Sequence, residues 1–326
     1  MSTHTDFNEE SRPVHSGRKD PAGRPGPTGR KEGRRLRDLV ARRPLAWFFS
    51  LAYLLSWIAW TPYVLSENGL GVLHFSFPSA LGTTQLLGVL PGAYLGPILS
   101  AFLVTAATGG RPALRAWVRR FGQWRVSLRW YLVVLLSVPT ALTLALAALA
   151  GKGPEMPSAV ILAAYVPGLI MQMLTTGLAE EPGWREFAMP RLQRRYGPLA
   201  GTLILGPLWG AWHLPLFLSD WGNWPDVTWL MPVEFLATTV AFSFVMTYVF
   251  NRTGESLPMA MLLHTGVNNY FSIAGAELFP GLSPERTAHA FLLSATVPAV
   301  ILLMATRGRL GAPAADEVPP RPTPVA

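Results

Sequence analysis

The stretch SAVILAAYVPGLIMQMLTTGLAEE, residues 158–181, ends some two dozen largely apolar residues with two adjacent glutamates. An apolar run of this length can cross the ~30 Å hydrocarbon core of a bilayer as one α-helix. A lone carboxylate is costly at the end of such a run, and two adjacent carboxylates also repel each other. Because a purely structural helix would avoid both costs, Glu180 and Glu181 predict a functional site.

The rest of the chain repeats this apolar pattern. Of its 326 residues, 50% are hydrophobic and 14% are charged, which is unusual for a soluble protein. The sequence predicts an all-α, polytopic membrane protein with about eight transmembrane helices and an intramembrane polar cavity. The predicted spans are roughly 46–66, 85–108, 130–151, 158–180, 198–219, 232–250, 256–274 and 289–306. The absence of Cys excludes disulfides, thiolate metal sites and a Cys nucleophile.

The Lys and Arg residues lie almost entirely on one side of the predicted spans. With eight spans, 25 of the 27 fall on the side of the N-terminus, and only Lys152 and Arg286 fall on the other. By the positive-inside rule, both termini are therefore predicted to be cytoplasmic. Membrane orientation also explains the net charge of +8, so no nucleic-acid partner is expected.

Three parts of the chain differ in composition. Residues 1–38 are rich in Arg, Gly, Pro and Ser and predict a disordered, basic cytoplasmic tail. Residues 39–310 hold the predicted spans, and 311–326 predict a disordered C-terminal tail. Between the second and third spans, RPALRAWVRRFGQWRVSLRW (111–130) alternates Arg with apolar residues, which predicts an interfacial helix or, alternatively, a plain basic loop.

Ionisable residues inside the predicted spans are few and have companions at helical spacing. Arg185 follows Glu181 by four residues, Trp209 precedes His213 by four, and Asn268 follows His264 by four. Residues four apart share one helix face. Three helices therefore each bring polar groups toward one interior, which by default is a functional hypothesis for a membrane protein.

The motifs EEPGWRE (180–186), WGAWH (209–213) and HTGVN (264–268) resemble the EExxxR, FxxxH and HxxxN motifs of a known family. This is the CPBP family of intramembrane proteases, also called the Abi or CAAX-protease-and-bacteriocin-processing family. The likeness covers about residues 110–275, with the motifs in the same order. Trp209 departs from the pattern, because the family usually has Phe there.

The resemblance implies an eight-helix bundle and a set of site residues. Glu180 would be the central catalytic residue, with His213 and His264 lining the same cavity. Asn268 would help to stabilise the oxyanion, and Arg185 would hold the glutamates.

Two chemical routes stay open at this point. In the first, glutamate and histidine activate water. In the second, Glu180, His213 and His264 bind Zn²⁺, because one Glu and two His match a catalytic zinc ligand set. The chain contains no HExxH motif and no GxSxG serine elbow, so no motif supports a soluble zinc protease or a serine hydrolase.

We therefore expect an intramembrane endopeptidase in a bacterial plasma membrane. Its partners would be the lipid bilayer and a membrane-embedded or lipidated protein or peptide, cleaved in CAAX-type or bacteriocin-type processing. The alternatives are a non-catalytic membrane scaffold or regulator, and a proton-coupled transporter, for which an intramembrane Glu and His would also be expected. The sequence shows no inverted repeats in favour of transport.

The helix phase assigns the two glutamates different roles. Glu181 and Arg185 lie one turn apart and form an architectural ion pair, whereas Glu180 is rotated by about 100° and faces the histidines. One difficulty is depth: with straight spans, the glutamates lie almost at the surface and His213 roughly 22 Å into its helix. Either the fourth helix continues into the membrane beyond Glu181, or the fifth starts well outside the membrane or tilts, and Pro182 and Gly183 offer a bend at this point. We expect the end of the fourth span to differ from the predicted boundary.

Overall fold

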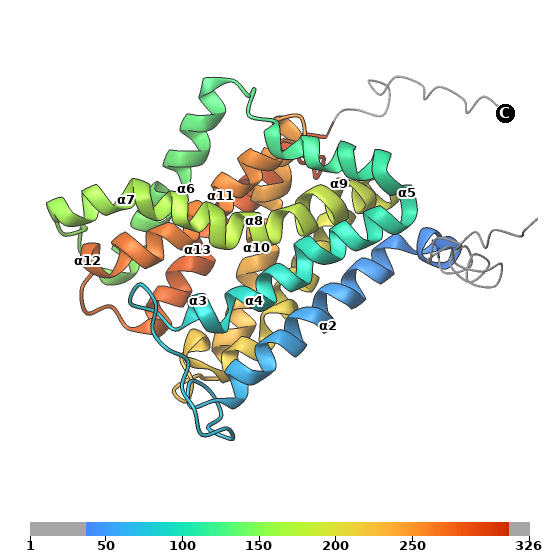
Figure 1. Cartoon of the computed structure of the whole chain (residues 1–326). Helices are drawn as coiled ribbons and strands as arrows, with labels where there is room; N and C mark the ends of the chain where they lie inside the picture. The colour runs from blue at the N-terminus through green and yellow to red at the C-terminus, as the bar shows by residue number, and fades with distance from the viewer. Residues whose placement is uncertain (1–36, 313–326) are drawn as a thin grey trace, which may run out of the picture.

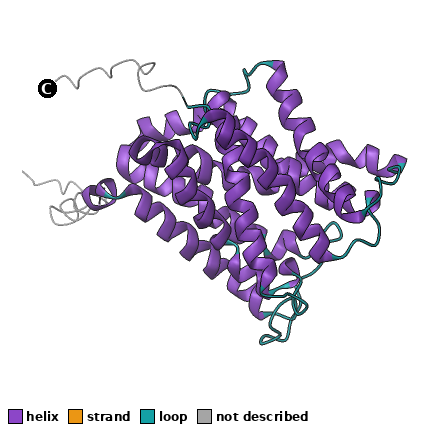
Figure 2. Ribbon diagram, turned by 180° about the vertical axis from the view of Figure 1, so that it is seen from behind, coloured by secondary structure: helices purple, strands orange, loops and turns teal. Residues whose placement is uncertain are grey.

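The computed structural model describes residues 37–312, and these residues form helices joined by loops, the longest of which covers residues 66–84 (Figures 1 and 2). The described part contains no β-strand, which agrees with the predicted all-α class. The longer helices are α2 (Pro44–Leu65), α5 (Leu99–Arg119), α6 (Leu128–Ala150), α7 (Ala159–Gln172), α9 (Met189–Trp212), α10 (Leu230–Arg252), α11 (Leu257–Asn269) and α13 (Pro284–Thr306). Apart from residues 37, 38, 311 and 312, both predicted tails lie outside the described residues.

Six helical segments of the described chain are long and apolar enough to cross a membrane, fewer than the eight spans predicted. The predicted fourth and fifth spans both fall in one 60-residue segment, Ala159–Leu218. The predicted seventh span, 256–274, is not among the six. Its helix α11 carries the polar residues His264, Asn268 and Asn269, which make it less apolar than a lipid-facing span. Because most of α11 is buried within the bundle, these side chains do not face lipid.

The 60-residue segment folds back on itself within α9. Gly197 has φ 81° and ψ 167°, a non-helical conformation with positive φ that suits glycine. Glu181 and His213 each lie 16 residues from this bend, on opposite arms, so each lies about 24 Å of helix away from it. The glutamates are therefore deep in the bundle, because the fourth helix continues beyond Glu181, which is the first of the two alternatives.

The first arm is not a uniform α-helix. The glutamates belong to α8 (Leu178–Glu181), which lies between two wider π-helical turns, η3 (Met173–Gly177) and η4 (Pro182–Ala188). A π turn inserts an extra residue and so changes the direction of the side chains that follow it. Pro182 favours such a turn, because it has no N–H to give to the preceding α-helical ladder.

A second break separates a membrane-length helix from the basic segment. Gly110 has φ 59° and ψ −154° within α5, and Pro112–Arg119 continue as a helix beyond it. Trp117 on this helix is buried, and its Nε1 lies 3.4 Å from the carbonyl oxygen of Pro182. The predicted helix over the basic segment is therefore present as far as Arg119, with one face packed against η4.

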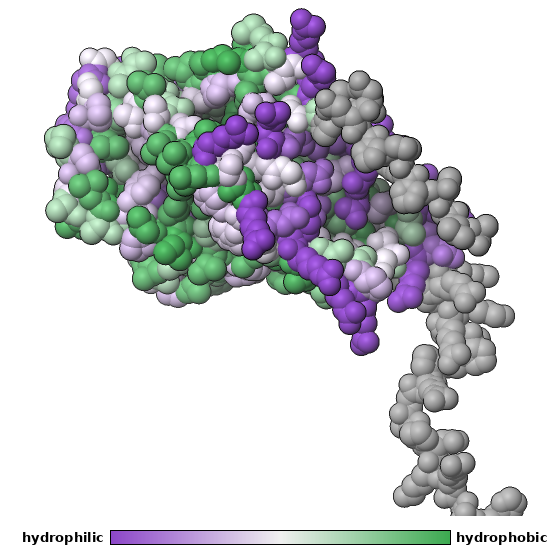
Figure 3. Space-filling view, turned by 90° about the horizontal axis from the view of Figure 1, so that it is seen from above, coloured by the Kyte–Doolittle hydropathy of each residue, from purple (hydrophilic) through white to green (hydrophobic). Residues whose placement is uncertain are grey.

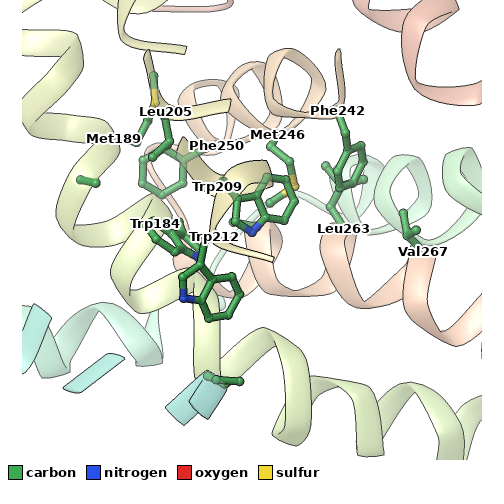
Figure 4. Close-up of a cluster of buried hydrophobic side chains, with 14 of the residues drawn as sticks. Trp184, Met189, Leu205, Trp209, Trp212, Phe242, Met246, Phe250, Leu263 and Val267 are labelled. Carbon is green, nitrogen blue, oxygen red and sulfur yellow. The ribbon is translucent and has the colours of Figure 1, made fainter. Parts of the chain in front are cut away.

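The core is dominated by large aromatic side chains. Trp184, Trp209 and Trp212 lie together near the middle of the cluster in Figure 4, flanked by Phe242 and Leu263. Trp184 and Trp212 are fully buried, with ring centroids 5.6 Å apart. Outside this core, hydrophilic residues gather on part of the face seen from above in Figure 3, and hydrophobic residues cover much of the remainder. This division fits a bundle with a hydrocarbon-facing flank and a polar end.

Candidate active site

The two glutamates are buried side by side at the centre of the molecule. Glu180 is 6% exposed and Glu181 is not exposed at all. Gly183 lets this segment approach η1 (Tyr94–Ile98), because a Cβ at this position would lie 2.6 Å from the Cβ of Pro97. The close approach to η1 buries the glutamates from that side.

Glu181 joins two helices by charge and hydrogen bonding. Its Oε1 lies 2.7 Å from Nδ1 of His264, and its Oε2 lies 3.5 Å from Nε of Arg185. All three side chains are buried. Because α8 and α11 come from segments more than 80 residues apart, this pair of contacts fixes the register of one helix against the other.

Arg185 is held mainly by charge. Its guanidinium has no hydrogen-bond partner among residues 37–312, although it is fully buried. The guanidinium carbon lies 4.7 Å from the centroid of the Trp209 ring, over its face. The negative face of an indole attracts a cation at this distance. Arg185 therefore depends on Glu181 and Trp209 for its stabilisation.

Glu180 faces the second arm of the segment. Nε1 of Trp209 donates a hydrogen bond of 2.8 Å to its Oε2. The other carboxylate oxygen makes no hydrogen bond with the described residues. One oxygen of Glu180 is therefore fixed, and the other is available to a reacting group.

His213 lies one turn beyond Trp209 and is held in a single orientation. Its Nδ1 lies 3.0 Å from the carbonyl oxygen of Trp209. Since a carbonyl only accepts, Nδ1 carries the proton and Nε2 presents a lone pair. The imidazole stacks on Trp221 with centroids 5.6 Å apart at an interplanar angle of 16°. No hydrogen bond links His213 to Glu180 in the described chain, but Trp209 contacts both.

Asn268 lies at the edge of this cluster. It is one helical turn from His264, on the same face of α11, and its side chain is half-buried. Its Nδ2 donates a hydrogen bond of 3.1 Å to Oγ1 of Thr176. The structure therefore places Asn268 beside the glutamate-bearing helix without direct contact to Glu180 or Glu181.

The predicted zinc set is not assembled as a metal site. No three His, Cys, Asp or Glu side chains of residues 37–312 are grouped closely enough to hold a metal ion. The Nδ1 atoms of His213 and His264 are engaged by a carbonyl and by Glu181, which leaves Nε2 of each ring as the nitrogen that a metal would take. Zinc binding by Glu180, His213 and His264 stays a prediction.

Trp209 is the functional residue that sequence reasoning missed. In the sequence, Trp209 stood out only by its spacing from His213 and by its departure from the family motif, but its side chain hydrogen-bonds Glu180 and covers Arg185. Its ring also meets His264 edge to face, with centroids 5.1 Å apart. The signal was the departure from the family motif, because a Trp in place of Phe adds an N–H donor at a position facing carboxylates.

An all-α bundle with a buried cluster of two glutamates, one arginine and two histidines defines a polytopic membrane protein with an internal polar site. The comparisons with known proteins then specify the class. The family described as type II CAAX prenyl endopeptidase Rce1-like matches residues 162–270. CAAX prenyl protease 2 of Methanococcus maripaludis is 24% identical over 216 residues, which cover 63% of this chain and 78% of that protein. These findings confirm the resemblance to the CPBP family and support a peptidase.

Proposed function

We propose that this protein is an intramembrane endopeptidase that cleaves a lipidated, CAAX-type protein or peptide. The observation that carries the proposal is the arrangement around Glu180, where one carboxylate oxygen is fixed by Trp209 and the other is free. The similarity to CAAX proteases supports the same class of substrate.

The first step is the activation of water. The free oxygen of Glu180 and Nε2 of His213 are the two proton acceptors of the site, because Nδ1 of His213 is committed to a backbone carbonyl. A water molecule bound between them would lose its proton to this pair as its oxygen attacks the peptide carbonyl. The same proton then passes to the leaving amine, so the enzyme returns to its starting state.

The second step is stabilisation of the oxyanion. Glu181 holds Nδ1 of His264, which leaves Nε2 facing away from the carboxylate. In its doubly protonated form, His264 would donate Nε2–H to the oxygen that becomes negative. Asn268 would add a second donor if its Nδ2 released its hydrogen bond to Thr176 and donated to the substrate oxygen instead.

The test is a cleavage assay in proteoliposomes. The substrates are a fluorogenic farnesylated CAAX peptide and the same peptide without the farnesyl group. We expect the wild-type protein to cleave the farnesylated peptide and the Glu180→Gln variant to lose this activity. No cleavage by a folded wild-type protein, or equal cleavage by the variant, would contradict the proposal.

The metal requirement is separable from the activity. If Glu180, His213 and His264 bind zinc, the purified protein should carry close to one metal per chain, and each substitution should lower that content. Elemental analysis of the same preparations used for cleavage decides between the routes. Metal-free protein with full activity would exclude zinc and leave glutamate-activated water.

A further inference from the structure

A long apolar groove runs between α6 and α13. Its volume is about 710 Å³. Exposed side chains of both helices line it, among them Leu136, Leu144, Val297 and Ile301. Both helices are long and apolar enough to cross a membrane, so the groove opens toward hydrocarbon.

The two helices run in opposite directions, so the start of α6 lies level with the end of α13 (Figure 1). Side-chain contacts agree with this. The ring of Trp130, near the start of α6, packs on Tyr248 with centroids 6.1 Å apart. A Cβ at Gly311, just after α13, would lie 3.4 Å from the same Tyr248 ring.

This end of the groove is rich in arginine. Arg125 and Arg129 lie at the start of α6, and Arg307 and Arg309 follow α13. All four are exposed, and none forms an ion pair within residues 37–312. Arg129 lies four residues before Val133, a lining residue, and thus on the face of α6 that forms the groove.

The opposite end of the groove is different in charge. There, Lys152 lies 3.1 Å from Glu155, and Nδ1 of His289 lies 2.7 Å from Glu234. Arg286, in the first turn of α13, is exposed and forms no ion pair among the described residues. This end therefore has one unpaired arginine, whereas the other end has four, which gives an external anion the stronger attraction there.

The length of the groove matches one leaflet. Its lining on α6 extends from Leu132 to Ala145, which is about 20 Å of helix. Half of a ~30 Å hydrocarbon core is about 15 Å. An acyl chain lying in the groove would therefore place its headgroup at the arginine-rich end.

We propose that this groove binds one anionic phospholipid, with an acyl chain along α6 and α13 and its phosphate beside Arg129 and Arg307. The proposal commits to a lipid of the leaflet on the arginine-rich side, which the charge asymmetry of the sequence predicts to be cytoplasmic. It is independent of the peptidase reaction, because the groove contains none of the site residues.

Native mass spectrometry of the detergent-purified protein tests the proposal. The protein is titrated with phosphatidylglycerol and with phosphatidylcholine of the same acyl chains. We expect one phosphatidylglycerol to bind more tightly than phosphatidylcholine. A basic residue near an anionic surface contributes about fivefold to affinity, so Arg129→Gln with Arg307→Gln should weaken phosphatidylglycerol binding by about 25-fold. The same double variant should weaken phosphatidylcholine binding far less, because the choline cation already offsets the charge of its phosphate.

Two further variants separate the groove from general attraction. Ala141→Trp fills the groove and should weaken the binding of both lipids. Arg115→Gln with Arg119→Gln removes two exposed arginines of α5, away from the groove, and should change neither. Equal affinity of the wild-type protein for both lipids would overturn the proposal. So would the same loss in the α5 control, competition by inorganic phosphate, or displacement of the lipid by a farnesylated peptide.

Discussion

Two Glu–His pairs in this molecule have the same contact and different surroundings. His264 Nδ1 lies 2.7 Å from Glu181, and His289 Nδ1 lies 2.7 Å from Glu234. The side chains of the first pair are 7% and 0% exposed, whereas those of the second are 44% and 13% exposed. Contact geometry alone therefore does not identify the site.

The environment of each pair makes the difference. Beside Glu181 lie a second carboxylate and a buried guanidinium on its own segment, and the indole N–H donor of Trp209 from α9. The pair on α10 and α13 is a two-residue link at the edge of the bundle. We infer that the inner pair positions a reacting group, whereas the outer pair only connects two helices.

The largest expected effect is at Glu180. Replacement by Gln removes the proton acceptor but keeps an oxygen that can accept the Trp209 hydrogen bond. General base catalysis contributes about 10²–10⁴-fold, so kcat/KM should fall by at least about 100-fold. Thermal unfolding should stay close to that of the wild-type protein. A variant that keeps substantial turnover would place the chemistry elsewhere in the cluster.

Glu181 comes next, with an effect on stability as well as activity. Replacement by Gln leaves the buried guanidinium of Arg185 without its counter-charge. Breaking a buried pair in this way costs about 3–5 kcal/mol. We expect a lower midpoint of unfolding together with reduced cleavage, and a similar result for Arg185→Ala. If Glu181→Gln is inactive yet as stable as the wild-type protein, the roles assigned to the two glutamates are reversed.

The sequence was enough to predict the helical class and some of the residues that are buried together at the centre. Spacing of four residues placed Arg185 beside Glu181, since that separation is one turn of helix. The depth of the glutamates required the π turns around α8 and the bend at Gly197, which the apolar pattern does not reveal. The helix phase turned Glu180 toward both histidines, but His264 hydrogen-bonds Glu181 instead, because this contact depends on how α8 and α11 are rotated against each other.

Trp209 gives a smaller effect that tests the connection between the two arms. Replacement by Phe keeps the ring but removes the N–H that donates to Glu180. Because the ring is retained, Arg185 keeps its aromatic neighbour and unfolding should change little. We expect kcat to fall by about tenfold, which corresponds to the lower range for a hydrogen bond to a charged group, with KM within about twofold. If the free energy of unfolding falls by as much as the activation free energy of kcat rises, Trp209 is a packing residue only.

The smallest effect is expected at Glu234, which serves as the matched control for both inner glutamates. Its replacement by Gln breaks a Glu–His contact of the same length in another part of the bundle. Because His289 is 44% exposed, water can take over part of the lost interaction, and such pairs contribute only about 0–1 kcal/mol. We therefore expect kcat/KM within about twofold of wild type in the proteoliposome assay and nearly unchanged unfolding. A loss of activity as large as that of Glu181→Gln would mean that burial does not distinguish the two pairs, and the outer end of α10 would then belong to the functional machinery.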